Sequence, residues 1–384
     1  MGSTLVITND FPPRQGGIET FVRAMATRVP GNDVVVYTSR ETGDAAYDAT
    51  LPFPVVREST GMLLPTRRVT RRAVELARSH GCDRVWFGAA APLALMAPAL
   101  RRGGVRHMVA TTHGHEIWWA RMPGSRGVMR RIGSGVDVVT YLGQYTRDRI
   151  EPALGPGARM SRLVPAVDTE VYRPDAAAAL EVRTALGIQD KRVILCVARL
   201  VPRKGQDQLI QAMPLVRREV PDAVLLLVGR GPDEARLRRL VRRHAPGAVV
   251  MVGGVAHSRT PRYYAAADVF AMPCRTRKAG LEAEGLGIVF LEASASGLPV
   301  IAGDSGGAPD AVLDGETGYV VDGNDTAAIA DALTRVLLDP DRAAAMGGAG
   351  RRWVRESWSW DASARHLTRL LTPGEAPVAM PGER

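Results

Sequence analysis

Short β-rich runs alternate with helical stretches along almost the whole chain, and this alternation constrains the fold more than any other feature. In the first half such runs fall at residues 4–8, 34–38, 84–88, 108–112 and 137–141. The pattern restarts in the second half, with runs at 193–198, 223–228, 249–252, 269–272, 298–302 and 319–321. Alternation of this kind is typical of βα units on a parallel sheet. The sequence therefore predicts an α/β protein of two Rossmann-like, doubly wound domains.

The two predicted domains meet in the segment between the β-rich runs at 163–165 and 193–198. A chain of 384 residues is long for a single hydrophobic core. We expect an N-terminal domain at residues 1–170 and a C-terminal domain at residues 171–356. A last helix at residues 357–372 has an uneven apolar face and is expected to pack back on the N-terminal domain. The tail at residues 373–384, rich in Pro, Gly and Ala, is expected to be disordered.

Composition favours a cytoplasmic protein that binds anions. The start MGSTLVITND has neither the basic nor the long apolar region of a secretion signal. The three cysteines are far apart and form no CxxC pair, which fits a reducing compartment without a zinc site. A net charge of +10 favours nucleic acid, acidic membrane or phosphorylated ligands as partners. Solvated helix faces are an equally good explanation of any single arginine cluster.

The first candidate site is the loop NDFPPRQGGIETF, which follows the first predicted strand. Gly16 and Gly17 lack the Cβ that would block a close approach to the backbone. The helix that starts after them offers free N–H groups and the positive end of its dipole. This geometry favours a phosphate, although many Gly-Gly pairs are only tight turns, and the spacing is not that of the dinucleotide fingerprint.

His113 marks the second candidate site, in the stretch TTHGHEIWW directly after a predicted buried strand. Ligands of parallel α/β sheets bind beyond the carboxyl ends of the strands. A neutral imidazole there can hydrogen-bond a substrate hydroxyl. The alternatives are a structural histidine and a metal site with His115 and Glu116, but three ligands within four loop residues have poor geometry for one ion.

Two basic residues form the third candidate site, in VARLVPRKGQDQLI. Arg199 stands at the end of the second domain's first strand, and Lys204 lies just before a glycine and a helix. An arginine fork and a lysine point charge in these places make a phosphate clamp. The alternative is that both are merely exposed residues of a basic protein.

Glu284 and Glu292 form the last candidate pair. Glu284 lies among glycines in the loop before the helix predicted at residues 288–295, and Glu292 lies inside that helix. Helix rise separates the two carboxylates by roughly 10 Å, which is too far for a shared proton. We expect each to accept hydrogen bonds from hydroxyls, a sugar at one end and a ribose at the other, with a diphosphate at the helix N-terminus between them.

The combination of these motifs resembles the family-4 retaining glycosyltransferases of GT-B fold, in which two Rossmann-like domains face a cleft. The resemblance rests on Gly16-Gly17, His113, Arg199, Lys204 and the segment from Glu284 to Glu292 followed by GLPVIA and SGG. Ala198 departs from the family, whose members often have glycine before the arginine. The stretches NDFPPRQGGIET and AMPCRTRKAGLEAEGLGIVFLEASASG also resemble the actinobacterial phosphatidylinositol mannosyltransferases.

The resemblance implies a retaining hexosyltransferase. The acceptor would attack the sugar on the same face from which the diphosphate leaves, and the leaving diphosphate would take the acceptor's proton. It implies mannose from GDP-mannose and a phosphatidylinositol mannoside-type acceptor; a UDP-sugar with a small polar acceptor is the alternative. The implied catalytic set is His113, Glu284, Arg199 and Lys204. The implied donor-binding residues are Gly16, Gly17, Arg199, Lys204, Val255, Glu284, Gly287, Ile288, Val289 and Glu292. No metal ion or other cofactor is expected, because fixed cations and the helix dipole neutralise the phosphate.

In that family Arg199 and Lys204 would hold the diphosphate, Glu292 the ribose and Glu284 the 3- and 4-hydroxyls of the hexose. Backbone near Val255 would meet the base. The resemblance also implies that His113 contacts the 6-hydroxyl or the reacting centre. Gly17 would approach the β-phosphate from the first domain.

The acceptor is expected on the N-terminal domain, beside a membrane. Leu63, Leu64, Val69, Val74 and Leu76 accompany a cluster of arginines that would contact anionic lipid on the inner face of the plasma membrane: Arg67, Arg68, Arg71 and Arg72. A second contact would involve Trp118, Trp119, Met122 and Arg126. An ordinary surface helix is the alternative.

We expect a cytoplasmic monomer that associates peripherally with the membrane. We expect no nucleic-acid partner, since no aromatic residues interleave with the basic ones. A non-catalytic nucleotide sensor is the remaining alternative, against which the complete set of site residues argues.

Overall fold

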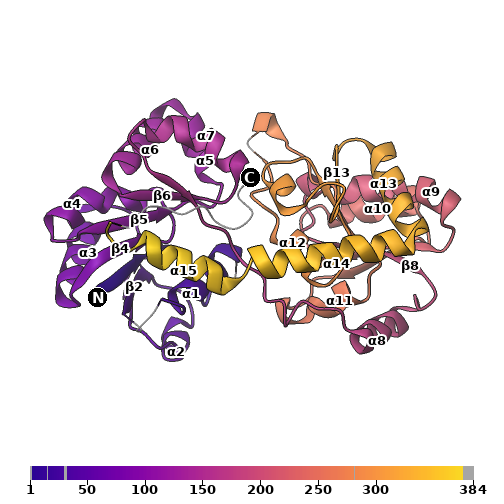
Figure 1. Ribbon diagram of the computed structural model, residues 1–384, viewed down its shortest axis with the longest axis horizontal. Helices are drawn as coiled ribbons and strands as arrows, with labels where there is room; N and C mark the ends of the chain where they lie inside the picture. Colours follow the sequence, from indigo (N-terminus) through magenta and orange to yellow (C-terminus); the bar gives the residue numbers. More distant parts are fainter. Residues whose placement is uncertain (1, 15, 30–32, 281, 375–384) are drawn as a thin grey trace. The chain divides into compact units, whose positions relative to one another are not determined.

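The computed structural model describes residues 2–14, 16–29, 33–280 and 282–374. The chain divides into two compact units, one formed by Met1–Pro165 with Trp360–Arg384 and the other by Ala166–Ser359. Figure 1 labels many of their helices and strands. The first unit ends before the boundary expected at residue 170, because its last strand already ends at Arg162. The tail expected to be disordered lies outside the described residues, except for Pro373 and Gly374.

A parallel sheet of seven strands forms the centre of the first unit, in the order β3-β2-β1-β4-β5-β6-β7. Its strands are β1 (Ser3–Ile7), β2 (Val34–Ser39), β3 (Val55–Glu58), β4 (Cys82–Phe87), β5 (His107–Thr111), β6 (Val138–Tyr141) and β7 (Met160–Arg162). The five predicted strands are confirmed, with ends that shift by one or two residues. The strand expected at 163–165 lies earlier, as β7, and β3 was not predicted because VVRE is a short run at the edge of the sheet.

Helices cover both faces of this sheet. They are α1 (Gly17–Ala26), α2 (Asp44–Asp48), α3 (Arg67–Ser79), α4 (Ala97–Arg102), α5 (Glu116–Arg121), α6 (Pro123–Gly135), α7 (Gln144–Leu154) and α15 (Trp360–Leu370), with the 3-10 turn η2 (Leu93–Met96). Strand alternation sends Leu5 and Ile7 to the core shared with α3 and α6, and Val6 to the core shared with α1 and α15.

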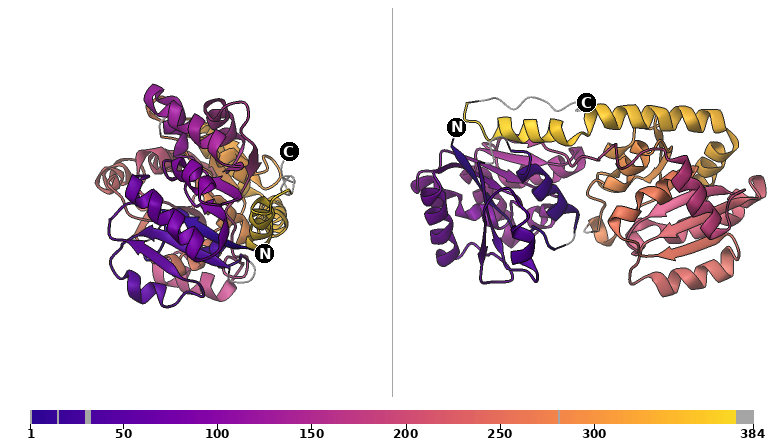
Figure 2. Two further views of the ribbon diagram at one scale, coloured as in Figure 1. Left: turned by 90° about the vertical axis from the view of Figure 1, so that its left-hand side faces the viewer. Right: turned by 90° about the horizontal axis from the view of Figure 1, so that it is seen from below.

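The last helix, α15, completes the second of these cores. Its Leu367 and Leu370 are buried against the sheet together with Met25 of α1. Two polar contacts hold it there: His107 Nε2 lies 2.7 Å from the Leu370 carbonyl oxygen, and His366 Nε2 lies 2.9 Å from Ser161 Oγ. Figure 2 shows α15 along one face of the first sheet.

The second unit contains a parallel sheet of six strands in the order β10-β9-β8-β11-β12-β13. The strands are β8 (Arg192–Val197), β9 (Ala223–Val228), β10 (Val249–Gly253), β11 (Val269–Met272), β12 (Val300–Gly303) and β13 (Gly318–Val321). All six were predicted. The clearest are β9, β11 and β12, which are buried on both faces and hence continuously apolar. Both units are therefore doubly wound α/β sheets, as the sequence predicted.

The helices of the second unit are α8 (Ala176–Leu186), α9 (Gln206–Glu219), α10 (Glu234–His244), α11 (Pro261–Ala265), α12 (Ile288–Ala295), α13 (Thr326–Leu338) and α14 (Pro340–Ser357). Its 3-10 turns are η3 (Pro202–Lys204), η4 (His257–Arg259), η5 (Lys278–Gly280) and η6 (Ala308–Ala311). The helix predicted at residues 288–295 agrees with α12 at both ends. In this topology β8 and β11 are neighbours, so the loops that follow them meet at one edge of the sheet.

Candidate functional site

An ion pair between Lys204 and Glu284 lies at the carboxyl edge of the second sheet. Lys204 ends η3, which follows β8, and Glu284 lies in the loop between β11 and α12. Lys204 Nζ is 2.6 Å from Glu284 Oε2, and the two side chains are only 12% and 9% exposed. Arg203 Nη1 lies 3.5 Å from the same oxygen and donates to the Ala283 carbonyl at 3.2 Å. Two cations therefore fix this carboxylate, and sequence reasoning missed Arg203 although PRKG places it beside Lys204.

Arg199 follows β8 and is exposed. Its carbonyl oxygen accepts a hydrogen bond from Gln206 Nε2 at 3.1 Å. Within the part of the chain that the structure describes, its guanidinium forms no hydrogen bond or ion pair. The structure therefore pairs Lys204 with a carboxylate and leaves the Arg199 guanidinium available to a ligand.

The SGG motif holds the backbone of Glu284. Ser305 Oγ accepts a hydrogen bond from the Glu284 N–H at 3.3 Å, and the Gly307 N–H donates to the Glu284 carbonyl at 2.9 Å. A Cβ on Gly306, which has a φ of +64°, would lie 1.9 Å from that carbonyl oxygen, and one on Gly307 would lie 2.2 Å from the Gly285 oxygen. Both glycines are therefore required by the close approach of two chain segments.

Helix α12 begins directly after this loop, and its first turn has free backbone donors. Gly287 caps it with a φ of +81°, and a Cβ there would lie 2.6 Å from Phe290. The amides of Ile288 and Val289 donate to no other described residue, as expected for the start of a helix. The helix dipole adds a partial positive charge at the same place. These features together make an anion site possible at the start of α12.

Glu292 lies within α12 and is 5% exposed. The hydroxyl of Tyr264, on α11, donates to Glu292 Oε2 at 2.7 Å. Burial raises the pKa of Glu292, and the hydrogen bond from Tyr264 opposes that rise. Glu284 and Glu292 therefore have separate partners and environments. Sequence reasoning missed Tyr264, because nothing in YYAAAD indicates which tyrosine faces the helix.

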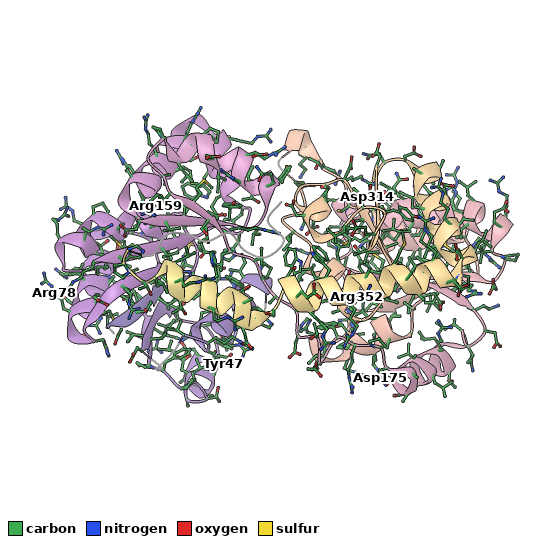
Figure 3. All side chains as sticks on the ribbon, in the orientation of Figure 1. Tyr47, Arg78, Arg159, Asp175, Asp314 and Arg352 are labelled. Atoms are coloured by element: carbon green, nitrogen blue, oxygen red, sulfur yellow. The ribbon has the colours of Figure 1, made fainter. Side chains whose placement is uncertain are left out.

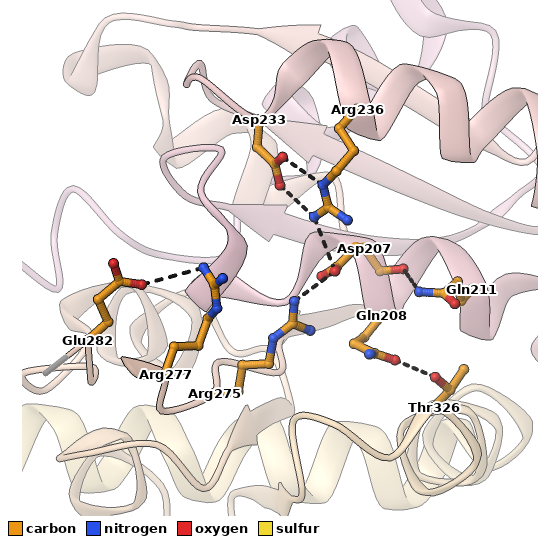
Figure 4. Close-up of polar contacts among 9 residues, drawn as sticks. All are labelled: Asp207, Gln208, Gln211, Asp233, Arg236, Arg275, Arg277, Glu282 and Thr326. Carbon is orange, nitrogen blue, oxygen red and sulfur yellow. Dashed lines mark hydrogen bonds and ion pairs between the residues drawn. The ribbon is translucent and has the colours of Figure 1, made fainter. Parts of the chain in front are cut away.

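Asp207, in the first turn of α9, connects the loop after β11 to the Lys204 segment (Figure 4). Its Oδ2 accepts hydrogen bonds from Arg275 at 2.7 Å and from Arg236 at 3.1 Å, and Arg236 also forms an ion pair with Asp233. Burial alone would raise the pKa of Asp207, but these guanidinium groups outweigh it and lower the pKa. The Arg275 N–H also donates to the Arg203 carbonyl at 2.9 Å. The network thus holds the two segments that carry Lys204 and Glu284.

Val255 follows β10 and is half-buried. Gly253 before it has a φ of +85°, and a Cβ on Gly254 would lie 2.9 Å from Arg230 Cδ. The Arg230 side chain therefore lies against this loop. Contact of Val255 with a base stays a prediction.

His113 follows β5 of the first unit, as the sequence predicted. Its Nε2 lies 2.6 Å from the Gly88 carbonyl oxygen. Burial is the main reason that the pKa of this imidazole lies below its usual value, so the neutral ring is favoured. Because a carbonyl only accepts, we assign the proton to Nε2, which makes Nδ1 an acceptor.

The buried carboxylate of Glu116 shapes the loop around His113. Glu116 Oε2 accepts the backbone N–H groups of His113 at 2.9 Å and of Gly114 at 3.1 Å, and Oε1 lies 3.2 Å from His115 Nε2. Glu116 thus closes the turn. Among the described residues, no group of three or more His, Cys, Asp or Glu side chains is arranged to hold a metal ion.

Gly16 and Gly17 lie at the start of α1, and Gln15 before them lies outside the described residues. A Cβ on Gly16 would lie 2.1 Å from Glu19 Oε2, whereas a Cβ on Gly17 would have no atom within 4 Å. Burial raises the pKa of Glu19, whose Oε1 lies 3.6 Å from Arg14 Nε. The described protein thus does not itself require glycine at position 17.

The predicted arginine cluster lies on the first two turns of α3. All four members are exposed: Arg67, Arg68, Arg71 and Arg72. Arg68 pairs with Glu58 at 2.5 Å, while Arg71 and Arg72 lie 3.8 and 3.6 Å from Glu75. Figure 3 shows Arg78, from the last turn of α3, projecting outward.

Of the five apolar residues expected beside these arginines, only Leu64 is exposed. Val69 and Leu76 are buried in the core because α3 turns this side toward the sheet, and Leu63, before the helix, is buried in the same core. Val74 is half-buried and packs against that core. The exposed apolar residues are Met62 at 60% and Leu64 at 48%.

At the second expected contact, Trp118 and Met122 are 49% and 44% exposed. Trp119 instead packs against the core, and Arg126 Nη2 reaches the Pro152 carbonyl at 3.5 Å. No helix in the described part of the chain is long and apolar enough to cross a membrane.

Comparison with known proteins gives two family matches. The model described as Glycosyl transferases group 1 matches residues 180–353, and Glycosyltransferase Family 4 matches residues 15–171. The chain is 48% identical to the GDP-mannose-dependent alpha-(1-6)-phosphatidylinositol monomannoside mannosyltransferase of Mycolicibacterium smegmatis, over 96% of this chain and 98% of that protein.

A second relative comes from Corynebacterium glutamicum. The chain is 46% identical to its GDP-mannose-dependent monoacylated alpha-(1-6)-phosphatidylinositol monomannoside mannosyltransferase, over 96% of this chain and 97% of that protein. Among solved structures, Anabaena Alr3699/HepE in complex with UDP matches with a TM-score of 0.78 at 18% identity, over 95% of this chain and 98% of that chain. This last match shows the fold, which is GT-B.

Proposed function

The chain belongs to glycosyltransferase family 4, and from this we propose that it transfers mannose from GDP-mannose to a phosphatidylinositol mannoside-type lipid with retention at the anomeric carbon. The observation that carries the proposal is the similarity to mannosyltransferases of that specificity, 48% identity over 96% of this chain and 98% of the M. smegmatis protein. The second domain would bind the donor, and the first would bind the acceptor.

For the donor, Arg199 and the first-turn amides of Ile288 and Val289 would bind the diphosphate. Lys204 would add its charge from beside Glu284, which accepts the 3- and 4-hydroxyls of mannose. Support comes from the ion pair of 2.6 Å between Lys204 and Glu284, because it sets a cation beside a hydroxyl acceptor. Gly287 would let the diphosphate approach the helix end.

The base and ribose would lie farther from the reaction. The backbone near Val255 would contact the base, and Glu292 would accept the ribose hydroxyls. Gly17 would approach the β-phosphate, which agrees with the absence of any described atom within 4 Å of a Cβ at that position. Gly16 would complete that loop.

In the transfer itself, the acceptor oxygen would bond to C1 on the face from which the diphosphate leaves. The bond from C1 to the diphosphate oxygen breaks, and the acceptor's proton passes to that leaving oxygen. No carboxylate acts as nucleophile. His113, neutral with Nδ1 as acceptor, would bind the 6-hydroxyl. Because fixed cations and helix amides stabilise the leaving charge, we propose that no metal ion is required.

We further propose that the protein acts as a monomer on the inner face of the plasma membrane. Arg67, Arg71 and Arg72, with exposed Met62 and Leu64, form a basic and partly apolar surface that suits anionic lipid. We call these five residues the α3 surface. Arg68 is committed to Glu58 and would contribute less.

A donor panel tests the proposal. Purified protein would be given GDP-mannose, UDP-glucose or UDP-N-acetylglucosamine with an actinobacterial lipid extract, and transferred sugar would be measured. We expect transfer from GDP-mannose alone. Transfer from a UDP-sugar would show that GDP-mannose is not the donor. If no sugar is transferred and neither GDP nor UDP binds, the proposal that this protein is a glycosyltransferase is overturned.

A further inference from the structure

We propose that Tyr264 is a positioning residue for the donor, which acts by fixing the carboxylate of Glu292 for the ribose hydroxyls. This inference rests on the proposed function. Tyr264 lies on α11 and is fully buried, so it acts on a ligand only through Glu292.

The environment of Glu292 makes this hydrogen bond important. Unlike Glu284, Glu292 forms no ion pair with a Lys, Arg or His of the described chain. A buried carboxylate without a cation depends on hydroxyl or amide donors for its stability. Tyr264 OH, 2.7 Å from Oε2, is such a donor. Three groups from different segments lower the pKa of this carboxylate: Tyr264, His257 and Tyr172.

Tyr264 is itself rigidly held. Its ring stacks on Phe270 at 5.6 Å with an interplanar angle of 26° and meets Tyr172 edge-on at 5.5 Å. Tyr172 is anchored in turn, with its hydroxyl 3.0 Å from Thr260 Oγ1. A fixed phenol that holds one carboxylate oxygen limits rotation of the whole group. The other oxygen is then oriented before a ligand binds, which lowers the entropic cost of binding.

Ribose-dependent binding separates this role from simple core packing. For full-length Tyr264→Phe, we expect the Kd for GDP to rise about tenfold, because one hydrogen bond to a charged group is lost. The Kd for 2′,3′-dideoxy-GDP should change less than about twofold, since that ligand has no hydroxyls for Glu292 to accept. The donor KM should rise more than kcat falls, because the ribose is remote from the breaking bond.

Tyr263→Phe is the matched control. Tyr263 lies beside Tyr264 on α11, and its hydroxyl has no hydrogen bond to any described residue. Both dissociation constants should match those of the unmodified protein. Equal weakening of both ligands by Tyr264→Phe, or no weakening of GDP binding, would overturn the inference.

A second pair of variants covers a folding defect. Glu292→Gln removes the buried charge, so Tyr264→Phe should fold in that background. We expect Glu292→Gln and the double variant Glu292→Gln with Tyr264→Phe to bind GDP equally, because Tyr264 acts only through the carboxylate. Weaker GDP binding by the double variant than by Glu292→Gln would overturn the inference. If the unmodified protein binds neither GDP nor UDP, the proposed function fails with it. Equal binding of GDP and its dideoxy form would overturn only the ribose role.

Discussion

Lys204 Nζ lies 2.6 Å from Glu284 Oε2, and Arg203 approaches the same oxygen at 3.5 Å. The ion pair joins the turn before α9 to the loop before α12. In the proposed enzyme it places the cation for the diphosphate beside the acceptor for the sugar hydroxyls. Binding at one end of the donor is therefore coupled to geometry at the other.

The first prediction concerns Glu284. We expect Glu284→Gln to reduce transfer by about 100-fold or more, because a charged acceptor at the reacting sugar is lost. GDP should bind as well as before or more tightly, since Lys204 no longer shares its charge. Turnover assays and calorimetry measure the two effects. Glu282→Gln is the control, as Glu282 pairs with Lys278 and should not affect either property; loss of GDP binding in Glu284→Gln would mean that Glu284 serves the other end of the donor.

Removing the cation instead should destabilise the second unit. Lys204→Met leaves Glu284, whose side chain is 9% exposed, with Arg203 as its one charged partner among the described residues. Breaking a buried pair in this way typically costs about 3–5 kcal/mol. The double variant Lys204→Met with Glu284→Gln should recover part of the loss in urea unfolding. A double variant no more stable than Lys204→Met would contradict the role assigned to the ion pair.

The SGG motif gives the third prediction. Gly306 and Gly315 both have positive φ, +64° and +77°, so alanine strains both backbones. Only at Gly306 would the new Cβ meet another atom, the Glu284 oxygen at 1.9 Å; at Gly315 nothing lies within 4 Å. We expect Gly306→Ala to lower both the Tm and transfer more than Gly315→Ala does. Equal effects of the two variants would show that the contact with Glu284 is unimportant.

Asp207 makes a pH-dependent contribution to stability. Its folded pKa is below the ordinary 3.8, so its charge stabilises the fold above that value, and the stabilisation is lost as the pH falls through the folded pKa. We expect Asp207→Asn to lower the free energy of unfolding at neutral pH and to flatten its decline in acid. Urea unfolding at a series of pH values tests this. An unchanged pH profile would contradict the prediction.

The α3 surface can be tested with vesicles. Replacing Arg67, Arg71 and Arg72 by Gln should weaken binding to vesicles containing phosphatidylinositol by about tenfold or more. The binding that remains should depend less on salt concentration than that of the unmodified protein. The matched control replaces three exposed arginines of α10: Arg239, Arg242 and Arg243. A co-sedimentation assay compares the two triple variants. Equal loss of vesicle binding in both triple variants would show that binding depends on net charge and not on the α3 surface.

The sequence was sufficient for most strands, although it missed β3 and misplaced β7, but not for every helix. The apolar runs of β9 and β11 are unambiguous, whereas α6 carries four glycines and α7 contains Pro152, so neither shows a clear helical pattern. Motif spacing led to Glu284 and Glu292. Their partners were missed because Arg203 and Tyr264 reach them only through the adjacency of strand ends and the packing of α11, and local patterning does not encode these.

The return of the chain to the first unit has a consequence for its synthesis. Residues Ala166–Ser359 are contiguous, but the first unit lacks Leu367 and Leu370 until α15 has left the ribosome. The final helix is made after the whole second unit, so the first core can close only once the end of the chain has been released. A truncated product would expose the apolar face of α1 to chaperones and proteases. Only complete translation therefore yields a fully buried first core.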